Sequence, residues 1–362
     1  MSRCKLEEFI SYEQPAKYIV DSDQYDDSYE TPVLTAGKSF ILGYTDEKNN
    51  IFDNLPVIIF DDFTTSVQFV DFPFKVKSSA MKLLKNTEQA DIKYCYYLLK
   101  FLQHTPENHK RQWLSATSQN IVELPTIEKQ KNIVMKLDKI LEVIDNQNKQ
   151  LELLDEAIKA RFVEMFGDPI TNDMLWNTVK LNDVCYGIGD GLHGTPEYDE
   201  YGDYPFINGN NLKNGMIEIT PSTKMVNEDI YRKYFIKLTE NTILLSINGT
   251  LGNLALYNGE KVVLGKSACY CNLIPDINRI FVCSVMKTDA FSNFLESNAT
   301  SSTIKNIGLK VIREFELIVP PLELQNQFAS FVEEIDKSRS RIQKSLEASQ
   351  ELFDSLMQEY FG

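Results

Sequence analysis

Pro125-Thr126-Ile127-Glu128-Lys129-Gln130 returns 195 residues later as Pro320-Pro321-Leu322-Glu323-Leu324-Gln325. At the same offset, Met165-Phe166-Gly167 returns as Tyr360-Phe361-Gly362. No gap is needed between the two matches. A repeat of this length indicates a duplicated structural unit, and it decides how the rest of the chain is interpreted.

Both repeated segments carry apolar residues at alternating steps of four and three. Eight of ten positions in each seam are apolar or aromatic, and this period is typical of long helices that pack as a coiled coil. Prolines before each run and glycines after it mark the expected helix ends. The predicted helix-packing residues are Ile133, Leu137, Ile140, Ile144, Leu151, Leu154, Ile158, Phe328, Val332, Ile335, Ile342, Leu346, Phe353 and Leu356.

Residues 133–165 would form a helix about 48 Å long at 1.5 Å per residue. Two such helices in one chain most simply pack against each other. A generic coiled coil used for dimerisation is the alternative that periodicity alone leaves open.

The composition predicts a soluble, cytoplasmic protein of two or three domains. The chain has 362 residues, 43% of them hydrophobic, and contains neither a run of 18 apolar residues nor a signal-peptide pattern. Its six cysteines show no pairing motif, and it has three histidines. We therefore expect reduced thiols and neither a metal site nor a bound cofactor.

The repeat divides the chain into four segments, 1–121, 122–168, 169–317 and 318–362. The first and third lack the heptad pattern and are predicted to be strand-rich lobes, which gives an α+β fold with pseudo-twofold symmetry. Strands are expected at 56–60, 67–70, 242–247 and 280–283, and helices at 92–102 and 290–295. Gly187–Gly191 is interpreted as a flexible turn, because no Walker lysine follows it.

A weaker parallel links the two lobes. Thr31–Gly37 matches Tyr204–Asn210, and Ser79-Ala80 matches Ser267-Ala268. We also align Asn120-Ile121 with Asn306-Ile307, which requires shifting gaps. The lobes are thus predicted to be related but far more diverged than the helices.

Along essentially its whole length the chain resembles the specificity (S) subunits of type I restriction–modification systems. The resemblance rests on the repeated Pro-x-x-Glu-x-Gln stretches, on the approach Ser302–Ile307, and on the turns Gly194-Thr195-Pro196 and Gly249–Gly252. The first lobe departs from the pattern, since it has no Gly-Thr-Pro turn.

The resemblance implies a subunit without catalytic activity that binds double-stranded DNA. Each lobe would be a target recognition domain that reads one half of a bipartite site, and the antiparallel helices would set the separation. Methyltransferase (M) subunits would dock on the helices and supply the S-adenosylmethionine chemistry, and restriction (R) subunits would join for cleavage. A rod of about 48 Å corresponds to about 14 base pairs at 3.4 Å each.

Candidate DNA contacts are hydrogen-bonding residues on glycine-punctuated loops, because loop side chains reach base edges and phosphates. Asparagine suits adenine, and lysine suits guanine or phosphate. In the second lobe the candidates are His193, Thr195, Asn208, Asn210, Asn211, Lys213, Asn248, Thr250, Thr303, Lys305 and Asn306. In the first lobe they are Thr35, Lys38, Ser39, Lys75, Lys77, Arg111, Ser118 and Gln119. The acidic stretch 21–30 is expected to face away from DNA.

The net charge of −15 is the main objection to DNA binding, because a protein that grips phosphates alone has a basic surface. We expect the isolated chain to bind DNA feebly and its complex with M subunits to bind specifically. The competing interpretation is a scaffold protein with a coiled-coil stalk and two interaction heads. An enzyme is disfavoured, because no catalytic motif is found in the sequence.

Overall fold

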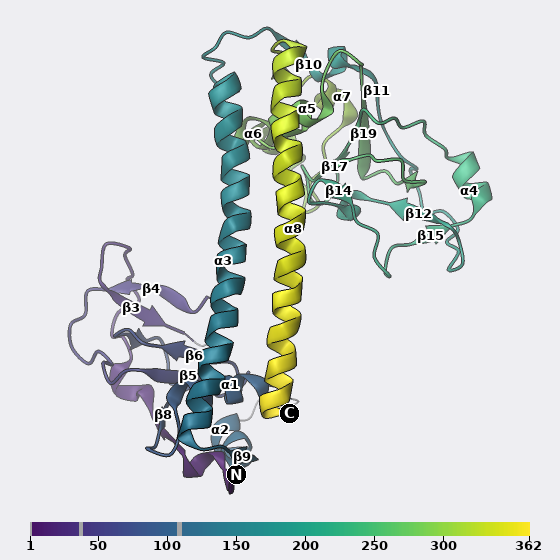
Figure 1. Cartoon of the computed structure of the whole chain (residues 1–362). Coiled ribbons are helices and arrows are strands. Elements are labelled where there is room, and N and C mark those ends of the chain that lie inside the picture. Colours follow the sequence, from purple (N-terminus) through teal and green to yellow (C-terminus); the bar gives the residue numbers. More distant parts are fainter. Residues whose placement is uncertain (1, 36–38, 107–110) are drawn as a thin grey trace. The chain divides into compact units, whose positions relative to one another are not determined.

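The structure is a computed structural model that describes residues 2–35, 39–106 and 111–362. It contains two compact units, one formed by residues 1–149 with 343–362 and the other by 150–342. Each unit holds one lobe together with parts of the two long helices α3 (Ile127–Phe166) and α8 (Leu322–Phe361) (Figure 1). Within the described ranges, no helix is long and apolar enough to cross a membrane.

The two predicted long helices are confirmed, and each is 40 residues long. α8 begins directly after Pro320 and Pro321. Proline fits this position because N–H groups at a helix start have no partner within the helix, so the missing N–H of proline costs no hydrogen bond. α3 ends before Gly167, whose φ of 75° lies in the left-handed region that favours glycine at a helix end. The same sequence signals therefore bound both copies of the helix.

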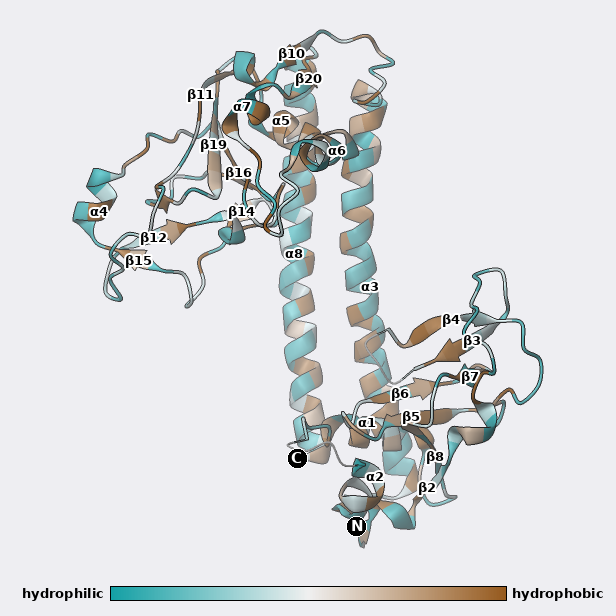
Figure 2. Cartoon of the chain, turned by 180° about the vertical axis from the view of Figure 1, so that it is seen from behind, coloured by the Kyte–Doolittle hydropathy of each residue, from teal (hydrophilic) through white to brown (hydrophobic). Residues whose placement is uncertain are grey.

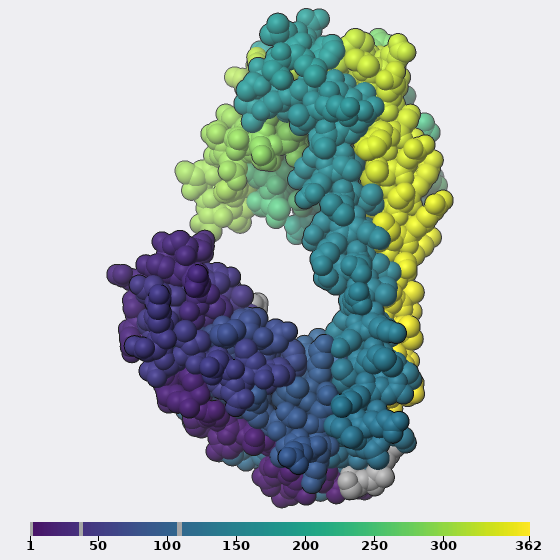
Figure 3. Space-filling view, turned by 60° about the vertical axis from the view of Figure 1, so that its left-hand side comes forward, coloured from purple at the N-terminus to yellow at the C-terminus, as the bar shows by residue number. Residues whose placement is uncertain are grey.

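The lobe of the first unit is built on a four-stranded antiparallel sheet in the order β2-β8-β5-β6. A second sheet, β4-β3-β7, contains one parallel pair, β3 with β7, and β1 pairs with β9. Figure 2 shows the apolar strand β5 inside this lobe. In Figure 3 the lobe forms one continuous surface with the start of α3. The elements are β1 (Ser2–Lys5), β2 (Ile10–Glu13), β3 (Thr31–Leu34), β4 (Ile41–Thr45), β5 (Val57–Asp61), β6 (Val67–Val70), β7 (Lys75–Val76), β8 (Met81–Asn86), α1 (Ile92–Phe101), α2 (Gln112–Ser115) and β9 (Ile121–Leu124).

The lobe of the second unit repeats this topology strand for strand. Its four-stranded sheet has the order β11-β19-β16-β17, its mixed sheet β15-β12-β18 contains the parallel pair β12 with β18, and β10 pairs with β20. A short hairpin, β13-β14, is additional. The elements are β10 (Thr178–Lys180), β11 (Cys185–Asp190), β12 (Tyr204–Ile207), β13 (Leu212–Lys213), β14 (Met216–Ile217), β15 (Met225–Val226), α4 (Glu228–Lys233), β16 (Thr242–Ser246), β17 (Leu254–Leu256), β18 (Val263–Leu264), β19 (Ala268–Leu273), α5 (Arg279–Val285), α6 (Asp289–Asn298), α7 (Leu309–Arg313) and β20 (Glu316–Ile318).

The predicted α+β class and the relation between the lobes are confirmed by this shared strand order. Thr31 and Tyr204 begin the equivalent strands β3 and β12, and Ser79 and Ser267 both lie just before equivalent strands. The third alignment is wrong. The carbonyl of Asn120 accepts from the Leu6 N–H at 3.1 Å, and the same contact in the second lobe joins Phe315 to Leu181 at 2.7 Å.

Asn120 is therefore equivalent to Phe315, which lies at the repeat offset of 195 residues, and not to Asn306. The alignment with Asn306-Ile307 followed two matching letters and introduced a gap that the fold does not have. The spacing from this position to the helix-start proline is identical in the two copies.

Two further expectations about local structure are wrong. The run 280–283 lies in helix α5, because Asn278 caps it by accepting hydrogen bonds from Ile280 and Phe281. A run of four apolar residues cannot distinguish a strand from a buried helix by period alone. Gly187–Gly191 is not a flexible turn, since residues 185–190 form strand β11, paired with β19.

The long helices pack antiparallel within the first unit. Lys136 bonds Tyr360 at 3.2 Å and Gln147 bonds Ser345 at 2.8 Å, so the partner numbers fall as α3 advances. Leu137, Phe353 and Met357 are buried together with Tyr97 of α1. The predicted packing residues Ile133, Ile140, Ile144 and Leu356 are partly buried against this cluster.

The same antiparallel contact recurs within the second unit. Asp155 pairs with Arg339 at 2.6 Å, and the rings of Phe162 and Phe328 lie 5.6 Å apart. Phe281 of α5 completes this aromatic cluster, which ties the lobe to both helices. Val332 and Ile158 join the core. The remaining predicted packing residues are half-buried: Leu151, Leu154, Ile335, Ile342 and Leu346.

Candidate nucleic-acid interface

Most of the predicted contacts of the second lobe lie on loops at one end of the strands of its four-stranded sheet. Because the strands are antiparallel, β11 and β16 end where β19 and β17 begin; Asp190 is registered with Cys269 and Ser246 with Ala268. The loops that leave this end carry the predicted residues.

Loop 208–211 is fixed by its own asparagines. The Ser267 hydroxyl donates to Asn208 Oδ1 at 3.0 Å and accepts from the Gly209 N–H at 2.9 Å. The Asn208 N–H donates to Asn211 Oδ1 at 3.0 Å. Asn208 and Asn211 thus shape the loop, which leaves Asn210 exposed on it.

A second pair of loops is joined by Asn248 and Asn306. Their backbones form an antiparallel bridge, the Asn248 amide donates to Asn306 Oδ1 at 3.3 Å, and the Gly249 N–H donates to the Lys305 carbonyl at 2.9 Å. This bracing presents Thr250, Thr303 and Lys305 in exposed positions. Loops from distant parts of the sequence therefore meet as one polar surface.

His193 lies on the loop that follows β11. Its Nε2 is 2.8 Å from Asp190 Oδ2, and its side chain is 70% exposed. Thr195 is exposed two residues further on. Lys213 is exposed at the β13–β14 turn, where its amine pairs with Glu218 at 2.7 Å.

The first-lobe candidates do not form one comparable cluster. Thr35, Ser39 and Lys77 lie near one end of the β4-β3-β7 sheet, where the Lys77 N–H bonds the Leu34 carbonyl. Lys77 also pairs with Asp23, so the acidic stretch 21–30 contacts this end of the sheet; that the stretch faces away from DNA stays a prediction. Lys38 lies outside the described residues.

The prediction that Lys75 contacts DNA is wrong. Its side chain is 2% exposed, with the amine 2.7 Å from Glu47 Oε2 and 2.9 Å from the Asn49 carbonyl. A buried ammonium needs such partners, and these make the residue part of the lobe's interior.

Ser118 is likewise a wrong prediction, because it is 1% exposed. Gln119 is exposed, but its amide accepts from Lys5 at 2.7 Å and donates to Glu7 at 2.6 Å. Both residues directly precede Asn120, which is equivalent to Phe315 and not to Asn306, so neither lies on a counterpart of the Asn306 loop. Arg111 is exposed at the start of α2, away from the β4-β3-β7 sheet.

Sequence reasoning missed Lys266. This residue is exposed between Gly265 and the start of β19, and its N–H bonds the Leu192 carbonyl at 3.0 Å. It therefore lies beside the His193 loop. The signal was present, since a lysine in a glycine-punctuated loop is the pattern used for the other candidates.

The described residues offer no metal site, as no group of three or more His, Cys, Asp or Glu side chains is placed to bind an ion in 2–35, 39–106 or 111–362. Burial raises the pKa of the Cys95 and Cys283 thiols above the ordinary range. These thiols stay protonated, which is the opposite of what a catalytic cysteine requires.

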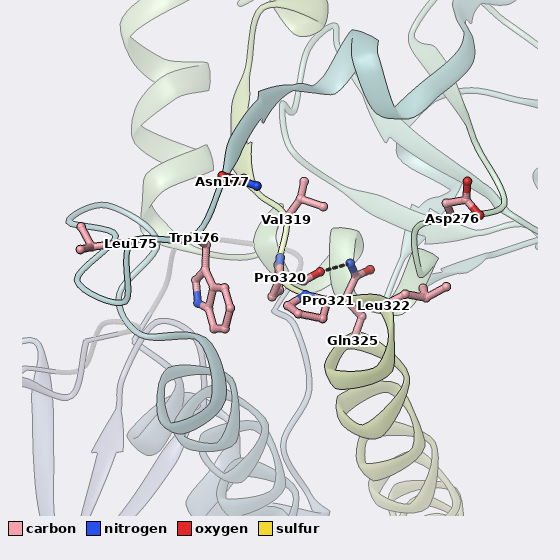
Figure 4. Close-up of a pocket in the computed structure, with 9 residues that line it drawn as sticks. All are labelled: Leu175, Trp176, Asn177, Asp276, Val319, Pro320, Pro321, Leu322 and Gln325. Atoms are coloured by element: carbon pink, nitrogen blue, oxygen red, sulfur yellow. Dashed lines mark hydrogen bonds between the residues drawn. The ribbon is translucent and has the colours of Figure 1, made fainter.

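The junction between the second lobe and α8 forms an open hollow. Figure 4 shows Gln325 donating to the Pro320 carbonyl, at 2.7 Å, beside the ring of Trp176. The Trp176 indole N–H bonds the Phe166 carbonyl at 3.0 Å, which also ties this corner to the end of α3. The lining residues are Leu175, Trp176, Asn177, Asp276, Val319, Pro320, Pro321, Leu322 and Gln325.

Comparison with known proteins agrees with this architecture. Residues 174–350 match the family described as "Type I restriction modification DNA specificity domain". The chain is 28% identical over 363 residues to the Escherichia coli "Type I restriction enzyme EcoR124I/EcoR124II specificity subunit", across 96% of this chain and 89% of that protein. The chain is thus similar, along nearly its whole length, to a type I restriction specificity subunit, and residues 174–350 match that family's DNA specificity domain.

Other similar proteins share fewer identical residues with this chain. The Methanocaldococcus jannaschii "MjaVIII specificity subunit" is 24% identical over 207 residues, which span 56% of this chain and 45% of that protein. The solved S subunit from M. genitalium has a TM-score of 0.66 at 15% identity and matches 100% of this chain and 96% of its own. A chain from a solved type I restriction–modification assembly has a TM-score of 0.51 at 14% identity, over 99% of this chain and 97% of that one. At these identities the two structures show the fold alone.

Proposed function

We propose that this chain selects the DNA sequence for a type I restriction–modification complex and carries out no catalytic step itself. The lobes in segments 1–121 and 169–317 each read one half of a bipartite site. The helical segments 122–168 and 318–362 set the separation of the halves. The observation that carries the proposal is that one lobe topology occurs twice, each copy joined to the start of one of two repeated helices.

The second lobe's loop surface supports a direct role in base recognition. Asn210, Thr250, Thr303 and Lys305 are exposed hydrogen-bonding side chains on loops that are braced by internal bonds. Rigid donors and acceptors of this kind read base edges in the major groove. His193, Thr195 and Lys266 extend the same surface.

Methyltransferase subunits are proposed to dock on the helices and to bind S-adenosylmethionine, and restriction subunits to join for cleavage. At a net charge of −15, this chain lacks the excess of cations that gives DNA-binding proteins most of their affinity. The M subunits would supply much of that affinity, while this chain supplies sequence discrimination.

Methylation mapping of genomic DNA tests the proposal. The chain is expressed with its M subunit, and residues 169–317 are then exchanged for the equivalent segment of another family member. We expect one half of the methylated motif to change and the other half and the spacer to stay the same. An exchange that leaves the motif unchanged, with methylation intact, contradicts the proposal and favours the scaffold interpretation.

A further inference from the structure

We propose that a hollow in the second lobe binds a phosphate group of the DNA backbone, with Lys287 and Lys213 as its cations. This inference rests on the proposed DNA-binding function and adds to it a backbone contact that positions the lobe. Lys287 lies just beyond α5, outside the loops considered above.

The lining of the hollow has the chemistry of an anion site. Two lysines and two asparagines are among the residues that line a space of about 360 Å³, and no Asp or Glu of the described residues is among them. Lysine amines and amide N–H groups are the donors that phosphate oxygens accept from. The lining residues are Leu212, Lys213, Asn214, Gly215, Gly252, Asn253, Leu254 and Lys287.

The walls of the hollow are held by the backbone. The β13–β14 turn is closed by Asn214 and Gly215, which have φ values of 52° and 78°, and Gly215 bridges to Ala255 of β17. On the facing wall, the Gly252 N–H donates to the Ser246 carbonyl at 3.0 Å, and the Asn253 N–H donates to the Ser246 hydroxyl at 2.8 Å. Lys213, Asn214 and Asn253 are therefore carried by segments that these backbone contacts hold in place.

The charges leave both lysines available to a phosphate. The pair between Lys213 and Glu218 is 53% and 42% exposed, and such surface pairs contribute little, so an incoming phosphate can compete for the amine. Lys287 is exposed, and no carboxylate of the described residues lies within 4.0 Å of its amine. An ammonium that has no carboxylate partner in the described part of the chain, and that lies beside a polar hollow, favours an external anion.

The position of the hollow fits a backbone contact. It opens at the start of β17, the same sheet edge from which the proposed base-reading loops leave, with Gly252 two residues after Thr250 and Lys213 two residues after Asn211. Proteins that read bases fix their register by holding phosphates next to the bases they contact.

The test compares Lys287→Gln with wild type in the complex with the M subunit. Binding to a duplex that carries the methylated motif is measured over a range of salt concentrations. We expect the slope of log K against log salt to become shallower by about one, as one phosphate contact is lost, while the methylated motif is unchanged. Lys213→Gln should act in the same direction. Lys261→Gln, an exposed lysine on the connection between β17 and β18, is the matched control and should leave the slope unaltered.

Neutral methylphosphonate linkages placed one at a time along the duplex give the second arm. Wild type should lose affinity at one linkage to which the Lys287→Gln complex is indifferent. An unchanged salt slope, or equal sensitivity of both complexes at every linkage, overturns the phosphate site. If the wild-type complex does not prefer its own motif to a scrambled duplex, the proposed function fails instead, so the two failures are distinguishable.

Discussion

The side chain of Gln130, in the first turn of α3, accepts a hydrogen bond from the Asp91 backbone N–H at 2.7 Å. The side chain of Gln325, at the start of α8, likewise accepts a hydrogen bond from the Asn278 backbone N–H at 2.9 Å. Asp91 and Asn278 cap α1 and α5, and both glutamines are fully buried. The 195-residue repeat thus duplicates a joint between helix and lobe as well as a helix.

We predict that Gln130→Leu destabilises the first unit by about 1–3 kcal/mol, because buried backbone groups lose their partners. Besides Asp91, these include the Pro125 carbonyl, to which the amide donates at 2.8 Å. Urea unfolding in a Trp176→Phe background measures this, since buried Trp113 then reports on the first unit alone. Gln325→Leu should destabilise the second unit equally, followed through Trp176 in a Trp113→Phe background.

Asn146→Leu is the control for the first of these variants, because Asn146 carries an exposed side-chain amide on the same helix and within the same unit. It should change stability by no more than about 0.5 kcal/mol. If Gln130→Leu and Asn146→Leu have the same effect, the joint contributes nothing specific.

Phe328 lies among Phe162, Phe166 and Phe281, with ring centroids 5.6 and 5.5 Å from the first two. Truncation to alanine should cost the second unit about 3–5 kcal/mol, because a fully buried ring leaves a cavity between both helices and the lobe. Unfolding in the Trp113→Phe background measures the loss. The equivalent position in the other copy is Ile133, which is only partly buried, so Ile133→Ala should cost the first unit clearly less. Equal losses would contradict the different packing of the two joints.

The sequence was sufficient for the long helices and insufficient for much of the lobes, and the reason is physical. Helix packing imposes a repeating period that survives in every heptad. The lobe strands are two to six residues long, and β5 is buried at every position, so no alternation marks them. Gln130 and Gln325 could be recognised in the sequence as repeated residues. Their hydrogen-bond partners lie 39 and 47 residues away, however, and can be identified only in the folded chain.

The candidate site likewise contains residues that the sequence could predict and residues that only the fold identifies. Exposed asparagines and lysines on the second lobe's glycine-containing loops were predicted, because glycine marks turns whatever the sheet order. Lys75 was misassigned, because only the fold places Glu47 beside it. Lys287 was missed, because it lies in a helical region and reaches the sheet edge through α5 packing.

The pair of Lys75 and Glu47 predicts a loss of stability in acid. Burial alone would raise the pKa of Glu47, but hydrogen bonds from the Lys75 ammonium and from the Ser22 and Asp21 N–H groups outweigh burial and lower it. The stability that Glu47 contributes is therefore full above the ordinary carboxyl pKa of about 4.3 and is lost as the pH falls through the lowered value. The midpoint of Trp113 unfolding should fall in wild type as the pH drops below about 4.3, and it should fall less in the double variant Lys75→Met/Glu47→Met.

The exposed Glu30→Gln variant should retain the acid dependence of wild type. Lys75→Met alone should lower stability near neutral pH by about 3 kcal/mol, because Glu47 then keeps a buried charge without its partner. The same variant should methylate the same DNA motif as wild type. A changed motif would show that Lys75 does contribute to DNA recognition.

Asn210 is predicted to contribute to reading one half-site. Its side chain is exposed on a loop held by Asn208 and Asn211, so Asn210→Ala removes an amide without altering the brace. We expect methylation to relax at one position of one half-site, with a discrimination loss of about 1–3 kcal/mol there. Methylome sequencing checks this. Asn258→Ala, at an exposed turn after β17, should leave the motif intact.

The isolated chain is predicted to bind DNA weakly and the complex with M subunits to bind it specifically. A net charge of −15 repels the phosphate backbone, and lysines such as Lys305 and Lys287 supply only local attraction. Fluorescence anisotropy measures the affinity of the isolated chain for two duplexes, one that contains the motif and one that is scrambled. We expect these two affinities to be nearly equal. Adding M subunits should raise the affinity for the motif-containing duplex, and not for the scrambled one. The increase should be at least about a thousandfold, the ratio that separates specific from non-specific sites. Tight, motif-specific binding by the chain alone would show that the lobes need no electrostatic help, and it would remove the main reason for assigning most of the affinity to the partner.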